Sequence, residues 1–403
     1  MDKKLKRISA RLAPNRLPQI ASYLLRDEAI SGKLIIVATM LALICANSPL
    51  ADAYERLWHT QLSVGLGQWA LQLDLRHWVN EGLMTFFFLV VGLEIKRETV
   101  KGELRKLRAA QLPIAAALGG MVVPALIYMA INRGSTGFVG WAIPMATDIA
   151  FAVGLLALVG RSIPASLKLF LLTLAIVDDI GAIIVIALFY GGGFSPLLFG
   201  LAVLLVMLLA SLRKTKLLNA PVFAAIGVGL WLSLNAAGIH PSIAGAILGF
   251  LAPVSVAGKH YRPLLERLER HTIPFSTLLV VPLFAFANTG VRLGNASFTD
   301  TTMRVGWGIA AGLIVGKLIG IVGASWLMIR FTRSRLPRGA VWSQMVGVGL
   351  LAGIGFTVSI FVTELAFASN TGLIDTAKLS IFAASALSAV LGLLILKRPK
   401  PTI

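Results

Sequence analysis

The chain has 403 residues, of which 57% are hydrophobic and only 14% are charged, and its mean hydropathy is +0.83. Soluble globular proteins are about half apolar and about a quarter charged, so these values exclude a soluble multidomain enzyme and a disordered chain. The single cysteine, Cys45, excludes a disulfide scaffold. The formal net charge of +19 indicates nucleic-acid binding only if the basic residues gather on one soluble surface.

Long apolar runs follow one another along the chain and predict membrane-spanning helices. Twelve spans of about 20 residues would use roughly 240 positions, which agrees with the apolar fraction. The runs lie at about 30–47, 77–93, 109–131, 140–159, 169–190, 196–212, 220–237, 241–254, 274–290, 305–329, 343–367 and 377–396. Between the first two, alternating leucine and valine residues around glycines predict a short β-hairpin from Gln61 to Asp74. We therefore predict an all-α polytopic membrane protein. We expect a basic segment at 1–29 to precede one integral membrane domain at 30–398.

Lysine and arginine residues alternate between dense and sparse loops. Twenty-nine of them fall in the N-terminal segment and the loops on the same side, whereas five fall on the opposite side: Arg56, Arg76, Arg133, Arg292 and Arg304. The positive-inside rule places both termini in the cytoplasm and requires an even number of spans. The positive charge therefore reflects topology and attraction to anionic membrane lipid, and it argues against a nucleic-acid partner.

Four charged residues lie deep inside the apolar runs: Asp148 in the fourth, Asp178 and Asp179 in the fifth, and Lys317 in the tenth. A charged residue at a span centre costs about 2.5–3.5 kcal/mol, so the four together cost on the order of 10 kcal/mol unless they are paired, protonated or hydrated. A purely structural role would need only one Asp–Lys ion pair, but the sequence has two further carboxylates. When all are ionised, the three aspartates and Lys317 together have a net negative charge. We therefore predict a site that binds a small cation, protons or each in turn.

Helix-breaking residues lie in two of the runs. The fourth contains Pro144 ahead of Thr147 and Asp148, and the eleventh contains Gly353 and Gly355. Backbone groups freed by such breaks must line a cavity or another protein surface, and paired interrupted spans are the best sequence indication of a transporter site. The fourth and eleventh runs are equivalent if spans three to five and ten to twelve are repeats of opposite orientation. We therefore predict that the two breaks face each other.

Small residues form stripes on two other runs. Gly312, Gly316 and Gly320 recur every fourth residue on the tenth run, and Gly245 and Gly249 do so on the eighth. Such stripes allow helix backbones to approach closely in a membrane. We predict close helix packing at both.

Several strings of this sequence resemble the NhaA sodium/proton antiporter family. They are FFLVVGLEIKRE at 87–98, GWAIPMATDIAFA at 140–152, AIVDDIGA at 175–182, PLFAFAN at 282–288 and GIGFTVSIF at 353–361. The similarity extends from about Ile30 to Arg398. It implies an inverted-repeat fold of twelve helices in which the fourth and eleventh are unwound and cross near the membrane midplane.

The resemblance also implies an activity. A protein of this family would export Na⁺ or Li⁺ electrogenically for a larger number of protons, by alternating access and under pH regulation, for sodium and pH homeostasis. It would be a secondary active transporter rather than an enzyme, it would need no cofactor, and it would lie in a bacterial inner membrane. The hairpin at Gln61–Asp74 would support a homodimer.

Carried onto this sequence, the resemblance implies that Asp178 and Asp179 bind Na⁺ and protons and that Asp148 lies among the half-helix ends. Thr147 would be a coordinating neighbour, and Lys317 would pair with Asp178 when no cation is bound. Five further residues match positions tied to cation access or pH response: Glu81, Glu94, Glu98, His240 and Glu269. His240 precedes a proline at a span end, where a capping or solvated histidine is common, so that interpretation stays open beside the pH response.

Two other functions are compatible with charged residues in a membrane. A sodium-coupled symporter of organic solutes needs an enlarged midplane pocket with additional polar groups, and the sequence shows no surplus of them. An intramembrane aspartyl protease needs one aspartate on each of two helices, one of them in a Gly-x-Gly-Asp signature. This sequence has no such signature, and Lys317 would have no role in a protease.

Overall fold

The computed structural model describes residues 28–64, 71–105, 107–159, 163–213, 215, 218–253, 264–292, 294 and 299–397. The basic segment predicted at 1–29 therefore lies outside the described residues except for its last two. Within the described ranges, the regular structure is helical apart from one two-stranded antiparallel sheet of β1 (Gln61–Val64) and β2 (Leu71–Asp74), and turns and irregular connections join these elements. The predicted all-helical architecture is confirmed, and so is the hairpin, in which Gln61 pairs with Asp74.

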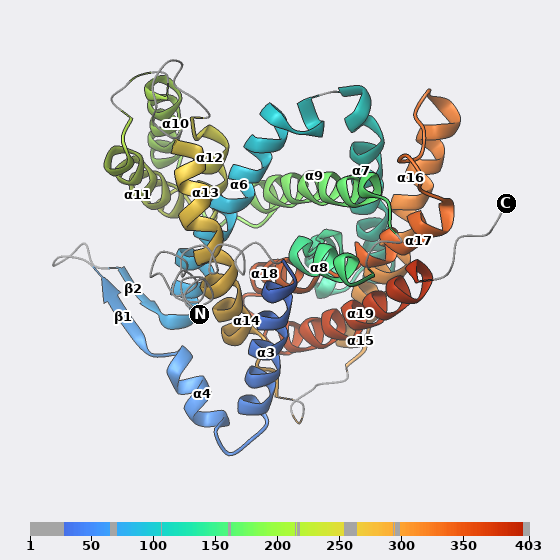
Figure 1. The fold of residues 1–403 in the computed structure, drawn as a ribbon. Coiled ribbons are helices and arrows are strands. Elements are labelled where there is room, and N and C mark those ends of the chain that lie inside the picture. The colour runs from blue at the N-terminus through green and yellow to red at the C-terminus, as the bar shows by residue number, and fades with distance from the viewer. Residues whose placement is uncertain are drawn as a thin grey trace, which may run out of the picture.

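The helices follow one another in a simple order, drawn in Figure 1. The first half contains α3 (Glu28–Ala46), α4 (Ala51–Trp58), α5 (Leu75–His77), η3 (Trp78–Leu83), α6 (Met84–Lys101), η4 (Glu103–Arg105), α7 (Leu107–Ile131), η5 (Thr136–Met145), α8 (Ile149–Val159) and α9 (Ala165–Phe189). The second half contains α10 (Pro196–Leu212), α11 (Ala220–Ala236), α12 (Ile243–Leu251), α13 (Leu264–Phe275), η7 (Ser276–Val280), α14 (Val281–Asn288), α15 (Asp300–Ala311), η9 (Gly312–Gly316), α16 (Lys317–Phe331), α17 (Trp342–Leu351), α18 (Phe356–Ala366) and α19 (Thr371–Leu396).

Many of these helices are long and apolar enough to cross a membrane. Among the described residues, six pass by length and composition, and nine pass if each of three bent helix pairs is one span. Two of the bent pairs are η5 with α8, bent by 40°, and α17 with α18, bent by 45°. Large apolar side chains also cover the outside of the molecule, as at Leu188, Leu197 and Phe331, which are 72%, 83% and 79% exposed. Such an apolar exterior suits a protein whose surrounding solvent is lipid.

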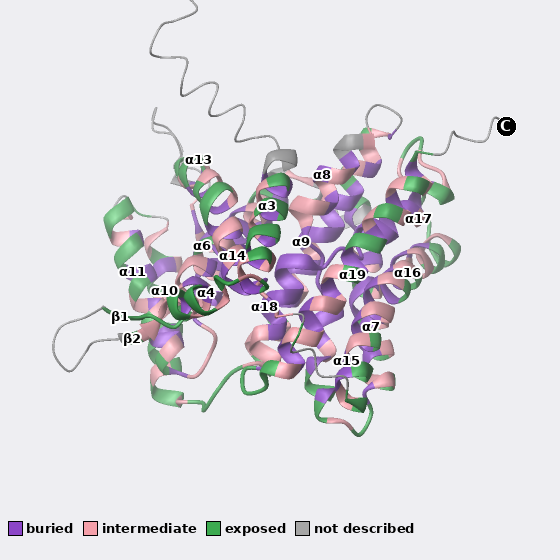
Figure 2. Cartoon of the chain, turned by 90° about the horizontal axis from the view of Figure 1, so that it is seen from below, coloured by how far each residue is buried: buried purple, intermediate pink, exposed green. Residues whose placement is uncertain are grey.

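The buried residues concentrate where α9, α18 and α19 lie at the centre of the molecule (Figure 2). In Figure 1, α10 and α11 lie at one side of this centre and α16 at the other. Glycines bring the surrounding helices into backbone contact. A Cβ atom at Gly320 of α16 would collide with the Gly119 carbonyl of α7, and one at Gly245 of α12 would collide with the Thr85 carbonyl of α6. The close packing predicted at the glycine stripes is confirmed.

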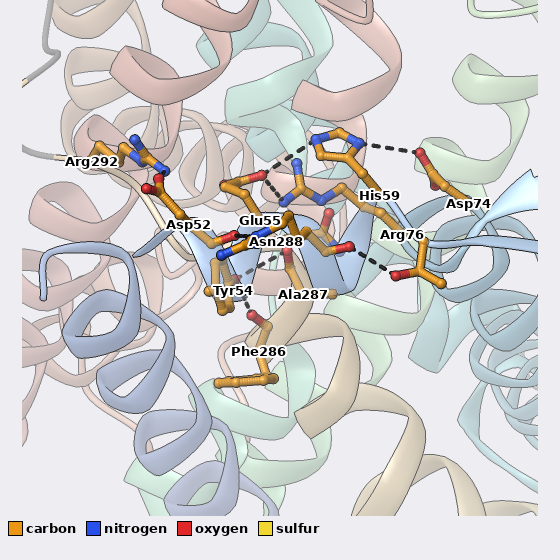
Figure 3. Close-up of polar contacts among 12 residues, drawn as sticks. Asp52, Tyr54, Glu55, His59, Asp74, Arg76, Phe286, Ala287, Asn288 and Arg292 are labelled. Atoms are coloured by element: carbon orange, nitrogen blue, oxygen red, sulfur yellow. Dashed lines mark hydrogen bonds and ion pairs between the residues drawn. The ribbon is translucent and has the colours of Figure 1, made fainter. Parts of the chain in front are cut away.

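A polar network joins α4 and the base of the hairpin to α14 (Figure 3). Arg76 forms an ion pair with Glu55 at 3.1 Å. The Tyr54 hydroxyl donates to the Phe286 carbonyl at 2.5 Å. Asn288 of α14 and Asn80 of η3 exchange side-chain hydrogen bonds at 2.7 and 3.2 Å. These contacts hold α4 and the segment that follows β2 in place relative to α14.

Candidate functional site

The central helix α9 carries two adjacent buried carboxylates. Asp178 and Asp179 lie near the middle of this 25-residue helix, and they are 1% and 5% exposed. Adjacent residues of an α-helix point about 100° apart, so the two side chains face different neighbours. Asp178 faces Lys317 of α16, whose Nζ lies 2.6 Å from Asp178 Oδ2. Both members of this ion pair are almost completely removed from solvent.

Lys317 stands at a change of helical geometry. The π-helix η9 ends at Gly316, and Lys317 is the first residue of α16. Single π-helical turns inside α-helices occur frequently at functional sites, because they shift the direction of the side chains that follow. Lys317 Nζ also donates to Thr147 Oγ1 at 2.9 Å, and the Thr147 hydroxyl donates to the Ala352 carbonyl at 2.8 Å. Lys317 thus links α9 to the breaks of both bent pairs.

Asp148 lies at the break between η5 and α8, directly before the first residue of α8. Its Oδ1 accepts from the backbone N–H of Phe151 at 3.1 Å, the usual geometry of an aspartate that caps its own helix. Its Oδ2 accepts from the backbone N–H and the hydroxyl of Thr357, at 3.2 and 2.6 Å. Because Thr357 is the second residue of α18, the carboxylate caps two helix N-termini at once.

Further hydrogen bonds hold the two breaks against each other. The Asp148 backbone N–H donates to the Ile354 carbonyl at 2.6 Å, and the Ser359 hydroxyl donates to the Ile143 carbonyl at 2.8 Å. Backbone groups freed by the breaks therefore find partners on the opposite segment, as buried polar groups require.

The helix-breaking residues occupy the tightest places in this junction. A Cβ atom at Gly353 would collide with the Leu313 carbonyl, and one at Gly355 would collide with the Ser359 hydroxyl. Pro144 lies against Gly312, where a Cβ atom would also be too close. The small residues therefore permit the approach of α17 and α18 to η5 and η9.

The five residues predicted to serve cation access or pH response do not form one cluster. Glu81 of η3 and Glu98 of α6 lie on one continuous helical stretch, and their separation in sequence corresponds to about 25 Å at 1.5 Å per residue. Glu98 is buried, whereas Glu94 and Glu269 are half-buried. Of these carboxylates, Glu94 interacts electrostatically with Asp179.

His240 lies in the short connection between α11 and α12. Its ring contacts the Phe361 ring edge-to-face, with centroids 5.4 Å apart, and its Nδ1 lies 3.1 Å from the Ser242 hydroxyl. Phe361 belongs to α18, so the structure brings His240 to the half-helix that Asp148 caps.

Two features of the site escaped the sequence analysis. The hydrogen bonds from Thr357 to Asp148 join residues 209 positions apart, and the string GIGFTVSIF was noted only for its glycines and its resemblance. A second ion pair joins the buried Lys378 of α19 to the half-buried Glu364 of α18 at 2.6 Å. Glu364 lies inside the eleventh apolar run, and an acidic residue within a membrane span needs a partner. Its position in the sequence could therefore have indicated an ion pair with a residue such as Lys378.

The three aspartates are not gathered into a closed metal centre. Within the part of the chain that the structure describes, no three or more histidine, cysteine or acidic residues have the arrangement of a metal site. One oxygen of Asp178, Oδ1, is buried and accepts no hydrogen bond from the described residues. A buried carboxylate oxygen of this kind can accept a proton or coordinate a cation.

Comparison with known proteins settles the family. The description "Na+/H+ antiporter 1" belongs to the family profile that matches residues 22–396. The Na⁺/H⁺ antiporter NhaA 1 of Syntrophotalea carbinolica is 44% identical over 375 residues, which cover 93% of this chain and 95% of the relative. This chain belongs to the NhaA sodium/proton antiporter family. Another NhaA, from Pseudomonas putida, is 45% identical over 367 residues, covering 91% of this chain and 94% of the relative.

A solved structure supports the fold of this NhaA family member. The sodium proton antiporter MjNhaP1 from Methanocaldococcus jannaschii superposes with a TM-score of 0.54 at 14% sequence identity, covering 93% of this chain and 96% of that one. At this identity the likeness concerns the fold alone. Family membership and the apolar helices together establish a multi-pass membrane protein of a transporter family.

Proposed function

We propose that this protein is an electrogenic Na⁺(Li⁺)/H⁺ antiporter that exports sodium in exchange for protons by alternating access. Its pH-regulated activity would serve sodium and pH homeostasis. Family membership supports the reaction, and one observation supports the location of the site: Lys317 is paired with Asp178 beside Asp179 on a buried helix.

The exchange follows from competition for the same oxygens. The Lys317 ammonium neutralises Asp178 while no sodium is bound. An incoming Na⁺ takes the place of that ammonium and of protons, and it binds to the carboxylate oxygens of Asp178 and Asp179, with Thr147 as a neighbour. Asp178 Oδ1, which has no hydrogen-bond partner among the described residues, is the oxygen that this step requires. Protons arriving from the other side then displace Na⁺, so that inward proton movement drives outward sodium movement.

Asp148, at the break between η5 and α8, has the second part in the mechanism. Two helix N-termini would leave partial positive charge beside a cation path, and the Asp148 carboxylate offsets it. We propose that η5–α8 and α17–α18 are the fourth and eleventh spans, unwound and crossing near the midplane in an inverted-repeat fold, with Pro144, Gly353 and Gly355 at the unwound segments. Rocking of one repeat against the other would then expose the site to each side alternately.

Twelve spans account for the apolar helices. The nine candidate spans are completed by α10 and α11, each of 17 residues, and by the shorter α12. We propose one membrane domain over 30–398, with both termini cytoplasmic and the chain embedded in the lipid of a bacterial inner membrane. The hairpin would support a homodimer, and no cofactor takes part.

The accessory residues have separate places in this proposal. Glu94 lies near Asp179 and would guide cations to it. Glu81, Glu98 and Glu269 would contribute to cation access or to the pH response, and His240 would transmit pH through its contact with Phe361 of α18.

A sodium pulse tests the proposal. Acid-loaded inside-out vesicles containing the protein are given Na⁺ or Li⁺ at pH 6.5–8.5, and the proton gradient is followed with a pH-sensitive dye. We expect both ions to dissipate the gradient, and we expect Asp179→Asn to abolish the response while the protein stays folded. Normal exchange by Asp179→Asn would refute the assigned site. A response that requires an added organic solute would instead indicate the symporter.

No observation specifically favours that symporter. A cavity of about 410 Å³ is lined by Phe138, Trp141, Phe189 and Tyr190 among others. It contains none of the site aspartates.

A further inference from the structure

Thr357 is a buried residue to which the reaction scheme above gives no part. It is 2% exposed and lies at the second position of α18. Its hydroxyl donates the shortest of the described hydrogen bonds to the Asp148 carboxylate, at 2.6 Å, and its backbone N–H donates another at 3.2 Å. Both reach the same carboxylate oxygen, Oδ2.

The Asp148 carboxylate is held by hydrogen-bond donors rather than by an ion pair among the described residues. Its side chain is 3% exposed, and among the described residues no lysine, arginine or histidine forms an ion pair with it. The donors are the N–H groups of two helix N-termini and the hydroxyl of Thr357. Because the hydroxyl is the one side-chain donor among them, it is also the one that a substitution can remove without changing the backbone.

The position of Asp148 affects the site next to it. Asp148 interacts electrostatically with Asp179, so its negative charge adds to the attraction for a cation at that carboxylate. If the charge were lost to a proton, or if the side chain turned away, the site would bind sodium more weakly. A hydrogen bond to an ionised group contributes more than one between neutral groups, and it fixes the direction of the carboxylate.

We propose that Thr357 is a positioning residue of the transport site, whose hydroxyl holds the Asp148 carboxylate ionised and directed between the N-termini of α8 and α18. Thr357 itself does not bind the transported ion. Its hydroxyl sets sodium affinity through Asp148, and it couples the two broken spans, because the same carboxylate caps both half-helices. This inference rests on the proposed antiport function.

A short variant series separates the hydroxyl from the shape of the side chain. Thr357→Val keeps the volume and the backbone N–H but removes the hydroxyl, whereas Thr357→Ser keeps the hydroxyl. The matched control is Thr363→Val in the same half-helix. Thr363 is also completely buried, but its hydroxyl donates to the Ser359 carbonyl at 2.8 Å and not to a carboxylate.

The readout is the initial rate of exchange in inside-out vesicles at a series of Na⁺ concentrations, at pH 7 and at pH 8. For Thr357→Val we expect the apparent KM for Na⁺ to rise by about tenfold, the effect of losing one hydrogen bond to a charged group, while kcat changes by less than about twofold. The rise should be larger at pH 7, where protons compete more strongly. Thr357→Ser and Thr363→Val should both keep the parent KM within about twofold.

Several results of these measurements would overturn the role of the Thr357 hydroxyl. An unchanged KM in Thr357→Val, or an equal loss in Thr357→Ser, would overturn the role of the hydroxyl. A fall in kcat and thermal stability without a change in KM would show a structural role alone, and this result would also overturn the inference. If Thr357→Val fails to accumulate in the membrane, Thr357→Ala is measured under the same criteria. A parent protein without sodium-dependent exchange would refute the proposed function instead.

Discussion

Removing the Lys317 side chain tests whether the buried ion pair organises the site. In Lys317→Ala, Asp178 loses the ammonium at 2.6 Å, and Thr147 loses the donor at 2.9 Å. The two members of the pair are 0% and 1% exposed, so water cannot easily take the place of the lost partner. Removing one member of a buried pair typically costs about 3–5 kcal/mol, because it leaves an uncompensated charge. We therefore expect the free energy of unfolding to fall by about this amount.

The assay is equilibrium unfolding in mixed micelles, in which a denaturing detergent is titrated against a mild one. Lys33→Ala is the control, since Lys33 is an exposed lysine of α3 and its removal should change stability by less than about 0.5 kcal/mol. In Lys317→Ala/Asp178→Ala both charges are absent, and we expect part of the lost stability to return. If Lys317→Ala is as stable as the parent, or if the double variant shows only the sum of two independent losses, the ion pair does not hold α9 and α16 together.

Three further outcomes follow from the packing and the charges. Gly245→Ala should lower the free energy of unfolding by about 1–3 kcal/mol, because its Cβ atom would collide with the α6 backbone. The control is Gly323→Ala, whose Cβ atom would have no neighbour within 4 Å and should not change stability. Equal effects of the two substitutions would contradict the close packing at Gly245. Burial raises the pKa of Asp74, but hydrogen bonds from the His77 backbone and ring, with the charges of His77 and His59, lower it below 3.8 overall. Its stabilisation of the hairpin should therefore be present above pH 3.8 and be lost as the pH falls further. A carbon-13 titration should give an Asp74 midpoint below 3.8 that rises in His77→Ala, and a parent midpoint above 3.8 would contradict this. Asp179→Asn should stop exchange but fold normally, as judged by vesicle assays and gel filtration.

The parts of the fold that could be predicted are those encoded locally. Apolar runs predict helices because a bilayer demands about 20 apolar residues and internally satisfied backbone groups. Alternation around glycines predicts the hairpin at Gln61–Asp74 for a similarly local reason. The site residues Asp178, Asp179 and Lys317 could be found because charge inside an apolar run has a large cost.

The partners of these residues could not be predicted from local pattern. Thr357 and Asp148 lie 209 positions apart, and Lys317 and Thr147 lie 170 apart, so only the folded chain brings them together. The π-helix before Lys317 changes the direction of the side chain, and the Gly312–Gly316 string alone does not show this geometry. The runs at 196–212 and 220–237 did predict α10 and α11, but these helices are shorter than an ordinary span, so the count of twelve spans stays a prediction.

In the proposed mechanism, sodium and protons compete for the Asp178–Asp179 pair. Binding of radioactive ²²Na⁺ to the purified protein, measured from pH 6 to pH 9, tests it directly. We expect sodium affinity to fall as the pH decreases, and we expect Asp179→Asn to bind no sodium at any pH. Sodium binding that is independent of pH, or that persists in Asp179→Asn, would contradict it.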